Sequence, residues 1–287
     1  MRETPLANFR FCLIEYFVIL NRCPFPERGV RLPSVGSIRK IGLMFAVVLA
    51  CCSTALGQDD GTVGPERPSF STNAHIVPAG RVQLEGGASQ QRFGDIKGFD
   101  AGELLLRVGV SSRVELRAGL PSYVDTKAGG VQSTGADDAA IEGKVLVKSG
   151  DKGAVSVLAS TTLPTGTRRI AEHTYQPGGT LISDVNISKK IVVTTNVGYF
   201  RISLAGDRHD LTFAVSTLNF ALKRSINIYS EFYAQNLRHT YIHRYAATGG
   251  KWTIRNQTAI DLSCGFGIGN HAHGPDYYYS IGISRLF

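Results

Sequence analysis

Charged side chains alternate with apolar ones in several short stretches of this chain, and they are its best candidates for chemistry. In residues 113–120, Arg113, Glu115 and Arg117 alternate with apolar residues. Charges of both signs around one narrow wet passage can select solutes by their field, or they can neutralise one another and fill the passage. Both interpretations stay open. The inward-facing candidates are Glu103, Arg107, Arg113, Glu115, Arg117, Glu142, Lys144, Asp184, Glu231 and Asp261.

Histidines are the next candidates, because two groups of them suggest a metal site. His271 and His273 stand two apart near Asp276, and His239 is near His243, but neither group has an evident third ligand. No serine stands in a nucleophile-elbow sequence, and phosphate-binding loops and paired metal cysteines are absent from the sequence. We therefore expect no catalytic residue, no metal, no cofactor and no enzyme activity.

The alternation itself has the period of a β-strand, in which successive side chains point to opposite faces. Segments of about ten residues with this period recur from residue 81 to the end of the chain, and about twelve strands are expected. In the clearest segments one face is apolar and the other is polar, whereas the segments around residues 82–90, 153–163, 180–200 and 210–234 alternate less cleanly. An open sheet would leave unpaired backbone groups in lipid, so the pattern predicts an all-β fold, a closed up-and-down antiparallel transmembrane β-barrel.

The expected connections alternate between short and long, which is typical of membrane barrels and has no reason to occur in a soluble sandwich. Short turns are expected near residues 111–112, 149–152, 189–190, 223–224 and 255–256. Longer loops are expected near residues 92–99, 121–135, 164–179, 201–208, 235–244 and 269–275.

Composition disfavours several other classes of protein. Of the 287 residues, 43% are hydrophobic and 19% are charged. No apolar run after residue 58 approaches the roughly 20 residues that a membrane helix needs. Residues 1–57 hold four of the five cysteines, so a disulfide framework is not expected in the remainder. They also hold seven Lys and Arg against three Asp and Glu, and the mild positive charge of the remainder gives no support for nucleic-acid binding.

The N-terminal region has the organisation of an export signal. Arg39 and Lys40 precede the apolar run 41–52, and small residues follow it. This order is typical of a cleavable signal peptide, and we expect cleavage after Gly57. Residues 1–38 make an unusually long positive region, which leaves a downstream translation start open, and lipidation at Cys51 is the alternative to ordinary cleavage. The expected organisation is an N-terminal extension and signal peptide at 1–57, a periplasmic segment at 58–80 and the barrel at 81–287.

The last residues, 277–287, form an alternating strand that ends on the aromatic Phe287. Such a strand resembles the insertion signal of bacterial outer-membrane proteins. The expected partners are therefore outer-membrane lipid and the barrel-assembly machinery, and the expected location is the outer membrane of a Gram-negative-type bacterium. Arg285 departs from the apolar register, although a charge near the rim of the bilayer is tolerable.

Landmark stretches along the chain have the order and spacing of a known family. They are residues 66–70, 77–87, 103–110, 114–121, 160–166, 184–186, 230–233 and 261–267. Together they resemble the family called MetA-pathway of phenol degradation. Residues 135–138 are a weakened version of its glycine-aspartate stretch. The resemblance implies an outer-membrane transporter, and the family's name implies aromatic breakdown compounds.

The leading functional hypothesis is an outer-membrane channel or transporter for small solutes, with aromatic and acidic compounds as the candidate classes. The alternative is a non-conducting barrel that has a structural role or binds a ligand or partner. A soluble barrel with an apolar ligand inside is disfavoured. Such a barrel needs its apolar face inward, whereas here charged residues share the face opposite the aliphatic one.

We predict that the mature protein begins near Gln58, because the apolar core and the small-residue site end just before it. Mass spectrometry of the protein extracted from membranes should find this N-terminus. Recovery of peptides from residues 20–40 in the mature protein would contradict the assignment.

Overall fold

The computed structural model describes residues 62–204, 206–237, 241–268 and 276–287, and the regular elements in these ranges are β-strands. No helix in the described part of the chain is long and apolar enough to cross a membrane. The strands are β1 (Val82–Phe93), β2 (Ile96–Gly109), β3 (Val114–Gly119), β4 (Tyr123–Ala128), β5 (Val131–Ala136), β6 (Ala139–Gly150), β7 (Gly153–Leu163), β8 (Gly178–Ser188), β9 (Ile191–Leu204), β10 (Asp207–Lys223), β11 (Ile226–Leu237), β12 (Tyr241–Arg255), β13 (Thr258–Gly267) and β14 (Tyr277–Leu286).

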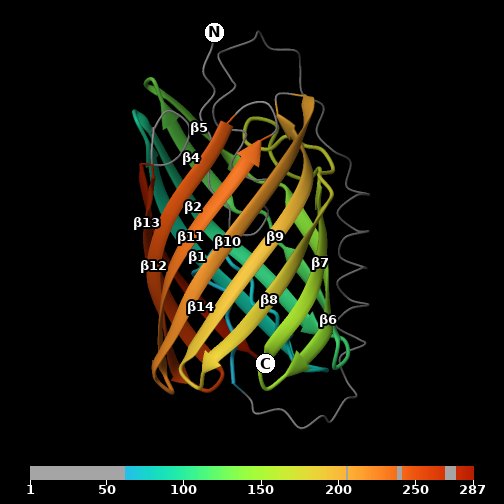
Figure 1. Ribbon diagram of the computed structural model, residues 1–287. Helices are drawn as coiled ribbons and strands as arrows, with labels where there is room; N and C mark the ends of the chain where they lie inside the picture. Colours follow the sequence, from blue (N-terminus) through green and yellow to red (C-terminus); the bar gives the residue numbers. More distant parts are fainter. Residues whose placement is uncertain (1–61, 205, 238–240, 269–275) are drawn as a thin grey trace.

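The strands form one closed wall (Figure 1). In order of hydrogen bonding the sheet runs from β1 through β14 back down to β6, then β3 and β2, and β2 pairs again with β1. β4 continues the line of β3, because one half of β2 pairs with β3 and the other half with β4. β5 pairs with β4 in the same way that β6 pairs with β3, so β5 and β6, like β4 and β3, count as one strand of the wall. The wall therefore has twelve strands, and the predicted closed antiparallel barrel is confirmed.

One rim of the barrel carries the short turns that the sequence predicted. The connections from β6 to β7, β8 to β9, β10 to β11 and β12 to β13 each span two residues. Tight turns of this kind join antiparallel strands without splaying them. We call this edge the short-turn rim.

The opposite rim differs from the prediction. Residues 92–99 and 201–208 were expected to be loops, but residues 92–93 pair with 96–97, and residues 201–204 pair with 207–210, so that β1 with β2 and β9 with β10 continue into these ranges. Outward side chains there are charged, and Arg201 Nη1 lies 2.6 Å from Asp210 Oδ1. Since outward charges belong in water, the strands continue beyond the apolar band. Much of 121–135 and 235–244 is likewise strand, whereas 164–177 remains a long connection.

The outward face supplies the apolar band that a bilayer requires. In β3, Leu116 is 52% exposed whereas the side chain of Arg117 is only 4% exposed, so the two neighbours point to opposite sides of the wall. In the middle of the last two strands, Leu262 and Ile281 are paired and both point outward. Aromatic residues including Trp252 also lie outward, as in the girdles of membrane barrels.

The C-terminal strand accommodates the charge that departs from its apolar register. Arg285 points outward one residue before the end of β14, and its guanidinium carbon lies 5.7 Å from the centre of the Phe287 ring. Its Nη1 donates a hydrogen bond to Thr258 Oγ1 at 3.1 Å. These contacts lie at the short-turn rim, where a charge on the outer face costs little.

The outward assignment predicts a large effect of charge in the middle of the wall. Leu262→Arg should cost about 2–4 kcal/mol of folding free energy in lipid, because a cation would face hydrocarbon near the bilayer midplane. Urea titration of the protein in lipid vesicles measures this cost. Leu262→Ala is the control, since it removes the apolar side chain without adding charge. Equal stability of the two variants would place Leu262 outside the bilayer core.

Candidate functional site: the barrel interior

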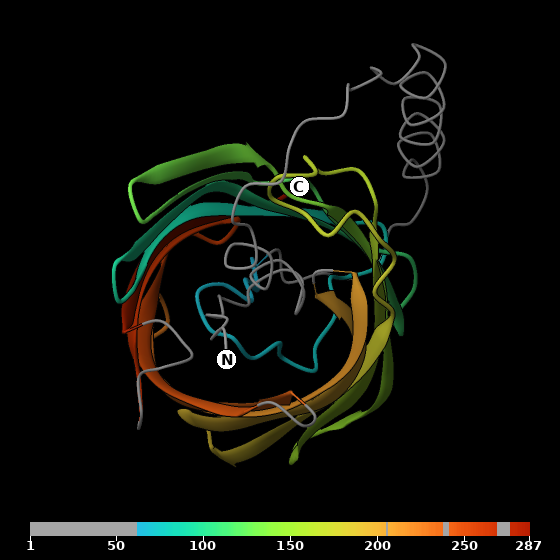
Figure 2. The ribbon, with the colours of Figure 1, turned by 90° about the horizontal axis from the view of Figure 1, so that it is seen from above.

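Residues 62–80, which we call the inner segment, lie inside the barrel (Figure 2). Viewed along the axis, this cyan segment runs within the ring of strands. Both of its ends are near the short-turn rim: the amide of Val63 donates to the carbonyl of Asn256 at 2.5 Å, and that of Gly80 to the carbonyl of Gly109 at 2.8 Å. From the sequence, this segment was expected outside the barrel, in the periplasm. The structure places it inside because its charges and amides have their partners there.

Every strand of the wall holds the inner segment through at least one polar side chain. These side chains are Gln83, Arg107, Glu115, Lys144, Ser156, Asp184, Asn196, Thr217, Glu231, Lys251, Asp261 and Ser280, from β1, β2, β3 and β6 to β14 in turn. The segment therefore forms a loop around the inner wall and is not attached to one side of it.

Arg67 of the inner segment lies in a slot between two strands. Gly87 of β1 and Gly282 of β14 are paired directly, and a Cβ atom at either position would collide with the guanidinium of Arg67. Glycine is therefore required here by the close approach of a side chain to the backbone. The slot lets a large cation lie flat against the wall.

Carboxylates and hydroxyls surround this guanidinium. Arg67 pairs with Glu103, and its Nε lies 3.7 Å from Asp261 Oδ2. It also donates to Ser280 Oγ at 2.8 Å. Glu103 itself has a left-handed backbone, with φ of 38°, next to a register shift between β1 and β2. Such a conformation costs of order 1–3 kcal/mol and persists only where the surroundings enforce it.

Glu66, the preceding residue, brings together three cations of the wall. Its carboxylate lies 3.3 Å from Arg107, 2.6 Å from Arg117 and 2.8 Å from Lys144. Arg107 is in turn paired with Glu115 at 2.9 Å. Burying such charges costs several kcal/mol per ion, and the cost is offset only when each has partners of opposite sign. The charges of segment and wall therefore compensate one another.

Wall carboxylates also bind backbone amides of the inner segment. Glu231 accepts from the amides of Phe70 and Ser71 at 2.9 and 3.0 Å, and Asp184 accepts from that of Ala74 at 2.7 Å. An irregular segment cannot satisfy its own amides as a strand or helix does, so acceptors must be supplied from elsewhere. Charge-assisted bonds of this type are stronger than neutral ones.

The structure brings together most of the site residues predicted from sequence. The side chains that face the interior are Glu103, Arg107, Glu115, Arg117, Glu142, Lys144, Asp184, Glu231 and Asp261. All of them except Glu142 contact the inner segment, and Glu142 pairs with Arg117 at 2.8 Å. Arg113 differs, because it precedes β3 in the turn at the short-turn rim and is exposed. The prediction extended the alternating pattern of β3 one residue too far, into the turn that precedes the strand.

The histidine groups do not form a site in the described residues. His239, His271 and His273 lie outside them. His243 is buried on β12 and stacks on Tyr245, with ring centres 6.3 Å apart. Within the described ranges, no group of three or more His, Cys, Asp or Glu residues is placed to hold a metal ion.

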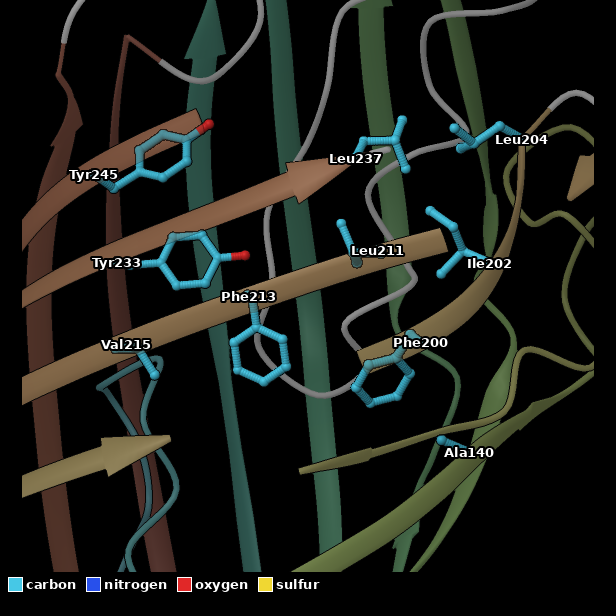
Figure 3. Close-up of a cluster of buried hydrophobic side chains, with 10 residues drawn as sticks. All are labelled: Ala140, Phe200, Ile202, Leu204, Leu211, Phe213, Val215, Tyr233, Leu237 and Tyr245. Atoms are coloured by element: carbon cyan, nitrogen blue, oxygen red, sulfur yellow. The ribbon is translucent and has the colours of Figure 1, made fainter. Parts of the chain in front are cut away.

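A second lining of the interior is apolar, and sequence reasoning missed it. The buried side chains of this lining, which we call the ring wall, cluster on the inner side of β9 to β12 (Figure 3). Their positions along these strands place them in the half of the barrel away from the short-turn rim. The only signal in the sequence was the imperfect alternation of these strands, where apolar residues occur on both faces. The ring wall consists of Phe200, Ile202, Leu204, Leu211, Phe213, Val215, Tyr233, Leu237 and Tyr245.

Glycines on neighbouring strands let the rings of this wall lie flat. Phe200 is paired with Gly178 and Phe213 with Gly198, and in both pairs a Cβ on the glycine would collide with the ring. A ring that lies over a glycine occupies less of the interior than one that projects inward. The pairing thus leaves the rings as a lining along the wall.

Comparison with solved structures identifies the fold. An outer membrane channel from Pseudomonas putida F1 is 11% identical, with 81% of this chain and 100% of that chain covered and a TM-score of 0.56. The NanC porin is 11% identical, with 71% and 98% covered and a TM-score of 0.50. The KdgM porin, in complex with disordered oligogalacturonate, is 10% identical, with 72% and 99% covered and a TM-score of 0.50. The chain thus has the fold of outer-membrane channels and porins.

Comparison with curated proteins gave no match. The profile of one protein family, described as "Putative MetA-pathway of phenol degradation", matches residues 66–275. The match begins in the inner segment, at Glu66, and covers the strands from β1 to β13. The resemblance noted in the sequence is confirmed, and the chain belongs to this family.

Proposed function

We propose that this protein is an outer-membrane channel for small solutes whose passage is controlled by the inner segment. The observation that carries the proposal is the loop that this segment makes around the interior of a twelve-stranded barrel. A barrel of this size has room for more than its own side chains, yet it is narrower than an open porin. A segment inside it therefore decides what passes.

The kind of contact that holds the inner segment supports reversible control of passage through the barrel, and not its permanent closure. They are ion pairs and hydrogen bonds, such as those of Arg67 and Glu66, and no covalent bond joins the described part of the segment to the wall except the chain itself. If the segment shifts, the charges that it compensates become available to solutes. Mixed charges at a constriction then select by charge and by hydrogen bonding.

A non-conducting barrel is the competing function, and one observation favours it. The segment has partners on all twelve wall strands, which is also what a permanent internal scaffold would have. The two functions differ in whether loosening the segment opens a path for ions.

Export and assembly complete the proposal. Cleavage after Gly57 would release residues 58–80 to fold into the barrel, and the C-terminal strand ending at Phe287 would be recognised by the barrel-assembly machinery. Both follow from the sequence pattern. The outward apolar band supports insertion into outer-membrane lipid, with Leu262 and Ile281 at its middle.

Loosening Arg67 should open the channel. Arg67→Ala leaves Glu103 and Asp261 without their cation, and removing one partner of a buried pair costs roughly 3–5 kcal/mol, so the segment should be released more often. Gly282→Ala should act in the same way, because its new Cβ would occupy the place of the guanidinium. Planar-bilayer recordings of the refolded proteins should show higher conductance for both variants than for the wild type.

Two controls make the test specific. Arg113→Ala removes an exposed arginine at the short-turn rim, and Gly143→Ala adds a methyl group to the wall in open space. Both should conduct like the wild type. If wild type, Arg67→Ala and Gly282→Ala all insert but pass no current, the barrel is the non-conducting alternative.

A further inference from the structure

Four aromatic rings of the ring wall follow one another from strand to strand. Their centres are 6.3 Å apart between Phe200 and Phe213, 6.4 Å between Phe213 and Tyr233, and 5.8 Å between Tyr233 and Tyr245. Figure 3 shows them on β9, β10, β11 and β12, on the inner side of the wall. Rings at such distances form a continuous surface with which a further ring can interact favourably.

One ring of the inner segment already occupies an edge of this surface. Phe70 stacks on Tyr233, with ring centres 5.2 Å apart and an angle of 23° between the planes, and it meets Tyr278 edge-on at 5.4 Å. Phe70 is only partly buried, unlike the rings of the wall. The chain itself thus shows what kind of group this surface accepts.

Phe70 also takes part in the hydrogen bonds to Glu231 that hold the middle of the inner segment. The amide of Phe70 donates to Glu231, which also accepts from Ser71 and from Thr217 Oγ1. Glu231 is two residues from Tyr233 on β11, and both side chains point inward. A group that takes the place of the Phe70 ring on Tyr233 therefore disturbs the hydrogen bonds that hold the middle of the segment.

Charge on the facing wall limits the ligand. β2 is six strands from β10 in either direction around the barrel, so it faces the ring wall. Glu103, which is paired with Arg67, lies near the middle of β2, and in the half of the barrel that holds the ring wall β2 presents the buried carboxyl group of Asp100, with Gln91 beside it at 3.3 Å. The inward side chains described in that half of β2 and in the ring wall include no cation, so an anion there would lose its hydration without gaining a partner, whereas an uncharged molecule would not.

We propose that the ring wall is a binding site for a small, uncharged, ring-bearing molecule, which displaces Phe70 from Tyr233 and so loosens the inner segment. This inference deepens the proposed channel function, because it assigns a class of ligand and a means of opening. The binding site stands on its own geometry, however, and is tested without measuring current.

Binding of 2-naphthol, an uncharged aromatic probe, tests the site. The protein in lipid nanodiscs is equilibrated with the probe by dialysis, and empty nanodiscs correct for partition into lipid. Aromatic pairs contribute about 0.5–1.5 kcal/mol, so Tyr233→Ala should weaken binding by about 2- to 10-fold. Phe70→Ala should tighten it by a similar factor, because the competing ring is gone. Naphthalene-2-sulfonate, of similar shape but anionic, should not bind.

Phe232→Ala is the matched control. Phe232 is an aromatic neighbour of Tyr233 on the same strand, but it points outward. Its loss should leave probe binding unchanged. Equal binding by Tyr233→Ala and Phe232→Ala, or no tightening in Phe70→Ala, would overturn the site.

Hydrogen exchange tests the displacement. With 2-naphthol, amides in peptides that cover residues 68–74 should exchange faster, since the bonds of Phe70 and Ser71 to Glu231 are loosened. Slower exchange there would mean that the probe joins Phe70 and does not replace it, which would overturn the opening mechanism. Probe binding with these effects but without any current would leave the site standing and remove the channel function. Current through the barrel without probe binding would overturn the binding site and leave the channel function standing.

Discussion

The rest of the interior depends on the ion pairs and hydrogen bonds of one buried group, the guanidinium of Arg67. A cation inside a barrel must keep its partners, and here they come from three different places in the chain: Glu103 on β2, Asp261 on β13 and Ser280 on β14. Those strands are brought together only by closure of the wall. Barrel closure and the position of the inner segment therefore depend on each other. In an open sheet, β1 and β14 would not form the slot, and the carboxylates of Glu103 and Asp261 would not meet beside it.

The inner face of the wall has two regions with different roles. Near the short-turn rim, charged side chains hold the segment through residues such as Glu66 and Arg67. In the other half, β9 to β12 present rings, and of the segment only Phe70 is packed against them. A polar surface can be satisfied only by specific partners, whereas an apolar one accepts any molecule of suitable shape. The segment is thus fixed at one end of the interior and meets a tolerant surface at the other.

Much of the wall could be predicted from sequence, because alternation is a local property. The outward position of Leu116, the inward position of Arg117 and the short turn at 189–190 all follow from neighbours in the chain. The inner segment could not, because its partners are far away: Ser71 contacts Thr217, and Ala74 contacts Asp184. A segment without periodicity gives no sign of what it will bind. The ring wall was missed for another reason, since apolar residues on both faces of β9 and β10 obscure the alternation on which the prediction relied.

The distribution of contacts sets how far a ligand can move the segment. A ligand shifts an equilibrium only by its difference in affinity for the two states. Replacing one ring on Tyr233 is worth about 0.5–1.5 kcal/mol, which changes the population of a loosened segment by about 2- to 10-fold. Moving a population from 1:99 to 99:1 takes about 5.5 kcal/mol. Exchange at Phe70 alone therefore adjusts the segment, and complete release requires that the pairs of Glu66 and Arg67 be broken as well. A solute that covers several rings and also competes for those charges would act on both halves of the interior, and the separation of the two surfaces makes that combination the condition for a wide opening.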